Sequence, residues 1–173
     1  MNIEMLKQDG EAVYLDIETT GFDRNRNDVT VVSVHRGGET KSFVKGKNLT
    51  PTSVSCAIHG ASPLVTFNGV QFDVPFLEAA MELSIDVPHL DLMPICHENN
   101  YGGSLSDVEE YFGITREDDP GGKGAVELWR KWQQGNDAAL MRLISYNQDD
   151  AKNLEQIATQ ISSDGQNGLE DFL

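Results

Sequence analysis

Tyr14-Leu15-Asp16-Ile17-Glu18-Thr19-Thr20-Gly21-Phe22 combines strand-forming residues with two acids. It continues an apolar, β-prone run that begins at Ala12, with the length that a buried strand needs, yet it carries two acids. Because side chains two apart on a strand project from the same face, the carboxylates of Asp16 and Glu18 should aim at one point. Like charges in a partly buried place need a cation between them, and hard divalent cations prefer oxygen ligands. The stretch predicts a Mg²⁺ or Mn²⁺ site, although a bare Asp-x-Glu more often lies on the wet face of an edge strand.

Composition limits the ways in which this protein can bind a polyanion. The 173 residues, enough for one domain with its own core, include 28 acids and 13 bases and give a formal net charge of -15. No basic block stands out, so binding of nucleic acid through clustered Lys and Arg is not expected. A bound polyanion would need bridging metals or a local basic patch. The excess of acid also fits a salt-rich cytoplasm, where self-repulsion is screened.

The sequence shows no sign of a membrane protein. Its N-terminus is polar, and no apolar run approaches the ~18 residues that a membrane span requires. We therefore expect a cytoplasmic protein without a membrane partner.

The pattern of elements predicts an α/β fold. Residues 29–35 and 40–44 are strand-like and are joined by Arg36-Gly37-Gly38-Glu39, so the first three strands should form an antiparallel meander. Ser106 and Glu109 indicate a capping box on a helix that ends before Gly113, and residues 116–124 form an acidic, Gly-rich loop. Further helices are expected over 51–59, 75–83, 125–134 and 137–161, and further strands over 64–67 and 89–92. These elements predict a mixed five-stranded sheet flanked by helices.

A second candidate site stretch is Phe67-Asn68-Gly69-Val70-Gln71-Phe72-Asp73. Asp73 follows a buried strand at the entrance of a helix, which is the rim where α/β sheets place their ligands. The alternative is that Asp73 serves only as a helix N-cap.

A third stretch lies in the last helix, at Tyr146-Asn147-Gln148-Asp149-Asp150. Tyr146 and Asp150 are four residues apart and share a face of the helix with Leu154 and Ile157, whereas Asp149 is rotated by about 100°. Asp150 should therefore point inward, where an unpaired charge is costly. The alternative is a solvated acid on a helix of mixed polarity.

Together the three stretches resemble the DEDD superfamily of 3′-to-5′ exonucleases on the ribonuclease-H fold, in the branch with Tyr in its third motif. The pattern is carried by Asp16, Glu18, Asn68, Phe72, Asp73, Tyr146 and Asp150. A closer resemblance is to the ribonuclease-H-like domains sometimes labelled YprB, through HLDLMP, SLSDVEEYFGI and LISYNQDDAKNLEQI, so the likeness runs from residue 12 to about 161. Ser106 stands where a Lys is expected. The resemblance implies a catalytic domain over residues 1–161.

The resemblance also implies two-metal phosphodiester hydrolysis. Asp16 would bridge two Mg²⁺ or Mn²⁺ ions, Glu18 and Asp150 would hold the ion that generates hydroxide, and Asp73 would support the second ion. Tyr146 would orient the attacking water, since a phenol with a pKa of about 10 is a poor base. For the substrate, the implied contacts are Thr20, Asn68 and Phe22, although Phe22 could equally belong to the core.

Residues 162–173 are expected to form a flexible tail with a binding peptide. A solvated tail seldom ends on apolar residues, and the spacing of Gln166, Leu169, Phe172 and Leu173 resembles the peptide by which archaeal and eukaryotic replication proteins dock on the sliding clamp. Docking of this kind would favour DNA over RNA as the substrate, a role in DNA replication or repair, and an archaeal source. The alternative is that Phe172 and Leu173 fold back onto the domain.

Two other functions remain open from the sequence. The chain could be a catalytically silent nucleic-acid-binding or adaptor module of the same fold, which the presence of all four carboxylates and Tyr146 disfavours. It could also keep the chemistry and act on RNA, or cut internally.

Overall fold

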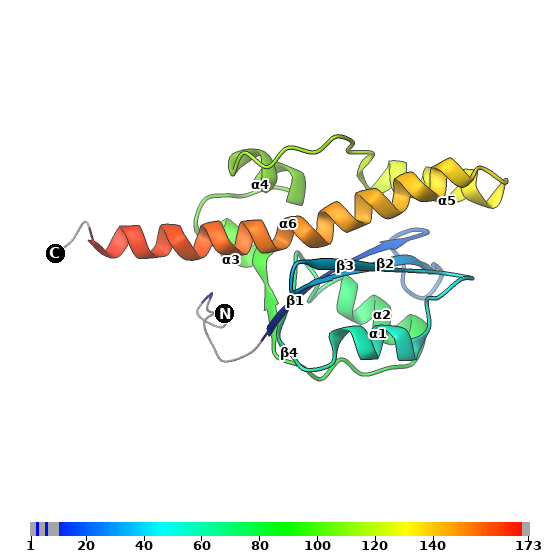
Figure 1. Ribbon diagram of the computed structural model, residues 1–173, viewed down its shortest axis with the longest axis horizontal. Helices are drawn as coiled ribbons and strands as arrows, with labels where there is room; N and C mark the ends of the chain where they lie inside the picture. Colours follow the sequence, from blue (N-terminus) through cyan, green and yellow to red (C-terminus); the bar gives the residue numbers. More distant parts are fainter. Residues whose placement is uncertain (1–2, 4–5, 7–10, 171–173) are drawn as a thin grey trace.

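A mixed sheet of five strands lies at the centre of the computed structural model, which describes residues 3, 6 and 11–170, and only the backbone of 164–170 (Figure 1). The strand order is β3-β2-β1-β4-β5. β1 pairs antiparallel with β2 and parallel with β4, and β4 pairs parallel with β5. The strands are β1 (Glu11–Thr19), β2 (Val29–Arg36), β3 (Glu39–Val44), β4 (Ala61–Thr66) and β5 (His89–Asp91). The meander and the mixed α/β sheet predicted from the sequence are confirmed.

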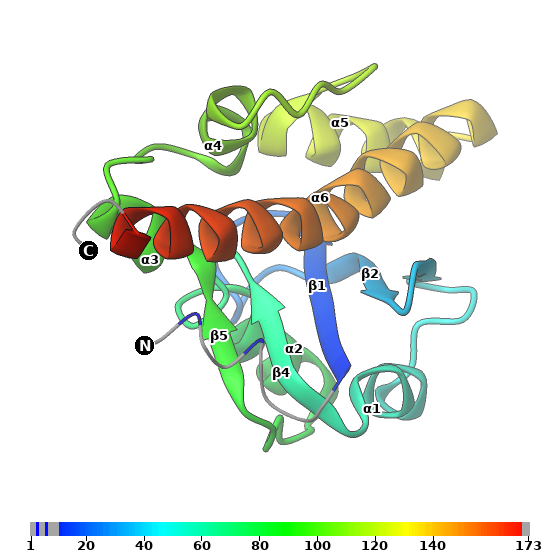
Figure 2. The same cartoon turned by 60° about the vertical axis from the view of Figure 1, so that its left-hand side comes forward.

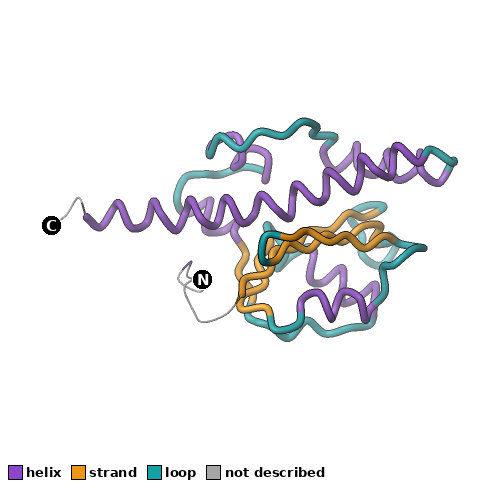
Figure 3. The backbone as a smooth tube through the Cα atoms, viewed as in Figure 1, coloured by secondary structure: helices purple, strands orange, loops and turns teal. Residues whose placement is uncertain are grey.

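Helices cover both faces of this sheet, as Figures 2 and 3 show from two directions. On one face lie α1 (Pro51–Ile58) and α2 (Asp73–Met81). The long helix α6 (Asp137–Glu170) crosses the other face. The remaining helices pack on the α6 side: α3 (Leu92–Glu98), α4 (Leu105–Tyr111) and α5 (Gly121–Gln133). None of the helices in the described part of the chain has the length and apolarity that a membrane span needs.

Successive side chains of β1 point alternately to the two faces of the sheet. Val13, Leu15 and Ile17 are buried in the core that α1 and α2 close. Tyr14 is buried on the opposite face, in the core that contains Leu154 of α6. Since every second side chain shares a face, Asp16 and Glu18 follow Tyr14 toward α6. The strand that the sequence stretch predicts therefore presents its acids to the last helix.

The helices differ from the sequence prediction in several places. The capping box of α4 is formed by Ser104 and Asp107, because the carboxylate of Glu109 is taken up in a buried ion pair with Arg116. α5 begins inside the expected acidic loop, at Gly121, whose N–H donates to Asp119 across 3.0 Å. Before it, α3 starts directly after β5 without having been predicted.

The last helix also continues beyond its expected end at Ile161, to Glu170. The clamp-binding prediction is not tested by this extension. Gln166 and Leu169 lie where only the backbone is described, and Phe172 and Leu173 lie outside the described residues.

Candidate active site

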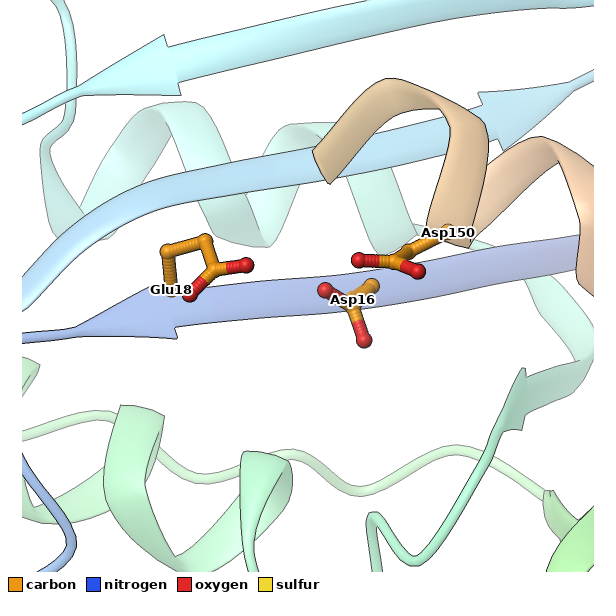
Figure 4. A group of neighbouring side chains, drawn as sticks. All are labelled: Asp16, Glu18 and Asp150. Carbon is orange, nitrogen blue, oxygen red and sulfur yellow. The ribbon is translucent and has the colours of Figure 1, made fainter. Parts of the chain in front are cut away.

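Three carboxylates from the two ends of the chain meet on the α6 side of β1. Asp16 and Glu18 come from β1 and Asp150 from α6, and one oxygen of each lies within 4.8 Å of the others. Figure 4 shows the carboxylate of Asp150 descending from its helix toward the two side chains on the strand. Oxygen ligands at this spacing can hold a hard divalent cation. The expected convergence of these three acids is confirmed.

Asp150 reaches the cluster because α6 is anchored on both sides of it. Leu143, Leu154 and Ile157 of the same helix are fully buried. Between them Asn147 donates from Nδ2 to Oδ2 of Asp16 across 2.6 Å, which ties the helix to the strand. Asp150 itself is only 4% exposed, so it points inward, and the alternative of a solvated acid is wrong.

Asp73 lies in the same cavity but outside the group of three. It is the first residue of α2, whose N-cap is Phe72 and has no side-chain cap bond, so Asp73 is not an N-cap. Burial raises the pKa of Asp73 to about 7, while hydrogen bonds from the backbone of Asp73 and Ile17 lower it and the charges of Asp91 and Asp150 raise it further. Asp73 is therefore electrostatically coupled to the three clustered acids.

Burial and mutual repulsion raise the pKa values of the clustered acids and so disfavour their charged forms. Desolvation raises the pKa of Asp16 well above its usual range, and the charges of Asp150, Asp73 and Glu18 add to the shift. Burial raises the pKa of Glu18 to about 9, and the charges of Asp150 and Asp73 contribute to the rise. The pKa of Asp150 rises to about 7 through burial, although Arg116 opposes the rise. Divalent cations would relieve this repulsion, so the residues fit the metal that the sequence predicts.

The acids open into a cavity of about 340 Å³ that collects most of the residues singled out by the sequence. Thr20 does not line it, since its hydroxyl accepts from the N–H of Asp28 at 3.0 Å and donates to Asn27 at 3.3 Å. Thr19 lines the cavity in that region. The other predicted site residues that line it are Asp16, Glu18, Phe22, Asn68, Phe72, Asp73, Tyr146 and Asp150.

Phe22 forms an exposed aromatic wall of the cavity. Its side chain is 82% exposed, so the alternative of a core residue is wrong. The ring lies 6.2 Å from that of Phe72, which lies 5.3 Å from that of Phe76, with distances measured between centroids. Because Phe76 is buried, the exposed ring is connected to the core through two tilted ring contacts. Such a ring is suited to stack on a base.

Tyr146 lies beside the acids with its hydroxyl protonated. Burial raises its pKa, and the charges of Asp150, Glu18 and Asp16 raise it further. The guanidinium carbon of Arg116 lies 5.3 Å from the centroid of the Tyr146 ring. The protonated hydroxyl of Tyr146 can donate or accept a hydrogen bond. Because its pKa is raised, the hydroxyl is not deprotonated at neutral pH and does not act as a base.

Sequence reasoning missed Arg116 and Glu109, which form a buried ion pair at the edge of the cluster. Arg116 Nη2 contacts Oε1 of Glu109 and donates to Oδ1 of Asp150 across 2.5 Å. The side chains of Arg116, Glu109 and Asp150 are only 7%, 2% and 6% exposed. Asn153 also donates to Glu109 across 2.9 Å. The only signal in the sequence was a single Arg at the start of an acidic loop.

Asp91 was likewise missed, although it lies in the HLDLMP segment. Its carboxylate accepts from the N–H groups of Asn68 at 2.7 Å, Val70 at 3.0 Å and Met93 at 3.1 Å. These bonds hold the turn after β4, where Asn68 has a positive φ of 63°. The turn leads into α2 and so positions Asp73.

Comparison with known proteins agrees with this fold. A family model described as the RNase_H superfamily matches residues 13–162. No curated protein sequence matches the chain. Among solved structures, the family B DNA polymerase from the archaeon Pyrobaculum calidifontis is 20% identical with a TM-score of 0.73, covering 89% of this chain and 25% of the polymerase.

Nuclease structures are similar over nearly the whole chain. NrnC from Brucella melitensis with bound Mg²⁺ is 18% identical with a TM-score of 0.63, covering 90% of this chain and 73% of NrnC. A structure described as the apo form of a nuclease is 18% identical with a TM-score of 0.62, covering 94% of this chain and 76% of that one. At these identities the likeness shows the fold, and the family match then assigns it: this chain belongs to the ribonuclease H superfamily.

Proposed function

We propose that this protein is a two-metal-dependent 3′-to-5′ exonuclease that hydrolyses phosphodiester bonds at single-stranded or frayed DNA ends. The observation that carries the proposal is the placement of Asp16, Glu18 and Asp150 within 4.8 Å of one another, in a cavity that Asp73 and Tyr146 also line. A catalytically silent module would have no use for buried acids that repel one another, because each one costs stability.

The residues divide the chemistry between them. Two Mg²⁺ or Mn²⁺ ions would supply an activated water and stabilise the departing 3′ oxygen. Asp16 would contact both ions, Glu18 and Asp150 would hold one, and Asp73 would support the other. Tyr146 would orient the attacking water through its hydroxyl.

The shape of the cavity supports attack at a chain end. Its volume of about 340 Å³ suits a ligand of nucleotide size. Phe22 stands exposed at the cavity, where it can stack on the terminal base, and Thr19 and Asn68 offer polar contacts. NrnC is also known bound to pGG, in a structure with a TM-score of 0.50 to this chain that covers 91% of it. A short single-stranded end in the cavity is consistent with that complex.

A degradation assay tests the proposal and its substrate. The protein is incubated with single-stranded DNA or RNA labelled at the 5′ or the 3′ end, with Mg²⁺, Mn²⁺ or EDTA, alongside the Asp16→Ala variant. We expect a ladder that shortens from the 3′ end of DNA with either metal, and none with EDTA or with the variant. Faster degradation of RNA than of DNA would show that the proposed substrate is wrong. Internal cuts would refute the proposed exonuclease activity. Binding without cleavage would indicate the catalytically silent module.

The tail supports recruitment to a sliding clamp. Gln166, Leu169, Phe172 and Leu173 keep the spacing of a clamp-docking peptide, in which the apolar side chains fill a pocket and Gln bonds at the rim. Removing residues 166–173 should abolish co-elution with an archaeal sliding clamp and leave cleavage of short DNA unchanged. The matched control is a full-length chain with Gln156→Ala, a substitution on the same helix outside the peptide. Unchanged co-elution of the truncated chain would refute docking.

A further inference from the structure

We propose that Arg116 is the resident cation of the metal site: it offsets the charge of the carboxylates and thereby weakens their affinity for divalent ions. This inference rests on the metal site of the proposed function and deepens it. It concerns a residue to which neither the three motifs nor the family match gives a role.

The position of Arg116 is the first argument. It comes from the loop between α4 and α5, lines the active-site cavity, and donates to Oδ1 of Asp150 across 2.5 Å. The same carboxylate belongs to the cluster with Asp16 and Glu18, in which one ligand atom of each residue lies within 4.8 Å of the others. A positive charge therefore directly contacts a residue that would bind the metal.

Burial is the second argument. The side chain of Arg116 is 7% exposed, and that of its partner Glu109 is 2% exposed, so water screens both charges only weakly. Nη1 of Arg116 is buried and has no hydrogen-bond partner among the described residues. An arginine retained only for its hydrogen bonds would be expected to use all its buried donors. The unused donor indicates that the charge itself matters.

The sign of the effect follows from Coulomb's law. A fixed guanidinium attracts the acids in the absence of metal and repels a divalent ion bound to the same acids. Glu109 acts in the opposite direction, since its negative charge lies behind the guanidinium. Removing the positive charge should therefore tighten metal binding, and removing the charge of Glu109 should weaken it. A residue that only orients Asp150 would give looser binding when removed.

Four variants separate these two roles. Glu109→Gln and the double variant Glu109→Gln/Arg116→Gln differ only at position 116, where the positive charge is removed, and neither leaves an unpaired Glu109 carboxylate. Arg116→Lys keeps the charge and loses the planar fork. Arg142→Gln is the matched control, because Arg142 pairs with Asp118 through two nitrogens as Arg116 does with Glu109, but on the surface and away from the cluster.

The measurement is Mn²⁺ affinity, by calorimetry and by the spectroscopic signal of free Mn²⁺, without substrate. We expect the double variant to bind Mn²⁺ roughly tenfold or more tightly than Glu109→Gln. Glu109→Gln should bind more weakly than the unaltered protein, Arg116→Lys within about threefold of it, and Arg142→Gln equally well. Thermal unfolding with saturating Mn²⁺ confirms that each variant is folded.

The result that overturns the inference is equal or weaker Mn²⁺ binding by the double variant than by Glu109→Gln. Failure of the proposed function looks different: the unaltered protein would then bind no Mn²⁺, or would bind it and cleave no nucleic acid. In the second case the order of affinities would still test the role of Arg116.

Discussion

The side-chain amide of Asn147 donates to Oδ2 of Asp16 across 2.6 Å, so a residue of the last helix holds the first acid of the sequence in place. Asn147 is fully buried and lies in the stretch that also supplies Tyr146 and Asp150. The helix therefore brings its own acid to the site and also orients the acid of β1. This relationship leads to the first of four predictions.

Replacement of Asn147 with Ala should lower kcat by roughly 10- to 100-fold, because the carboxylate of Asp16 loses the bond that orients it toward the metals. The matched control is Gln148→Ala. Gln148 is the next residue and also spans from helix to sheet, but its Nε2 donates to Oγ of Ser42 on β3 across 2.9 Å, away from the cluster. Steady-state cleavage of labelled DNA measures both variants. Equal loss in the two would indicate a general loosening of α6 and contradict the prediction.

Asp16→Asn should separate stability from activity. The substitution removes one partly buried charge from a group of like charges and leaves an amide oxygen to accept the bond from Asn147. We expect metal-free protein to gain about 1 kcal/mol in free energy of unfolding, while cleavage falls below detection because a metal ligand is lost. Denaturant unfolding in EDTA, paired with the cleavage assay, provides the measurement. A lower free energy of unfolding for the variant would show that the charge of Asp16 does not destabilise the metal-free protein.

The metal-free protein should lose stability as the pH rises. Folding raises the pKa of Asp73 and of Asp150 to about 7 and that of Glu18 to about 9, all above their ordinary values. The folded state then binds more protons than the unfolded state, so the free energy of unfolding falls with increasing pH. Below a pH of about 4 these acids are protonated in both states, and their full contribution to stability is present. That contribution is lost as the pH rises through the folded-state pKa values, about 7 for Asp73 and Asp150 and about 9 for Glu18.

Thermal unfolding between pH 5 and 9, with EDTA or with Mg²⁺, measures this effect. The melting temperature in EDTA should fall across the range, and saturating Mg²⁺ should flatten the curve, because bound cations keep the acids ionised. A rise with pH in EDTA would contradict the proton linkage. Curves that coincide with and without Mg²⁺ would contradict metal binding.

Phe22→Ala should weaken substrate binding without affecting the fold. The ring is 82% exposed, so its loss removes little burial, whereas stacking on a base is worth about 1–3 kcal/mol. We expect KM for single-stranded DNA to rise by roughly 5- to 100-fold, with the melting temperature unchanged. The control is Met141→Ala, since Met141 is an exposed apolar residue of α6 that does not line the cavity. An unchanged KM for Phe22→Ala would exclude stacking.

The sequence alone determined the sheet and the local part of the site. The apolar run with Asp16 and Glu18 specified β1 and put both acids on one face, because strand periodicity is a local property. Helical spacing did the same for Tyr146 and Asp150. Helix ends were less accurate: Ser106 and Glu109 have the capping pattern, but Glu109 is drawn into the core by Arg116, and Ser104 caps α4 instead.

The tertiary structure decided which distant groups meet. It paired Asn147 with Asp16 and Arg116 with Glu109 and Asp150, contacts between segments far apart in the chain that no local pattern encodes. It also placed Thr19 in the cavity instead of Thr20. The register of β1 against β2 shifts between Glu18 and Thr19, and such an irregularity in the ladder re-aims the side chains that follow it. Strand periodicity fixes the face on which a side chain lies only while the hydrogen-bond ladder between the strands is regular. Packing between helices and strands determines where that ladder becomes irregular and which charged side chains become neighbours.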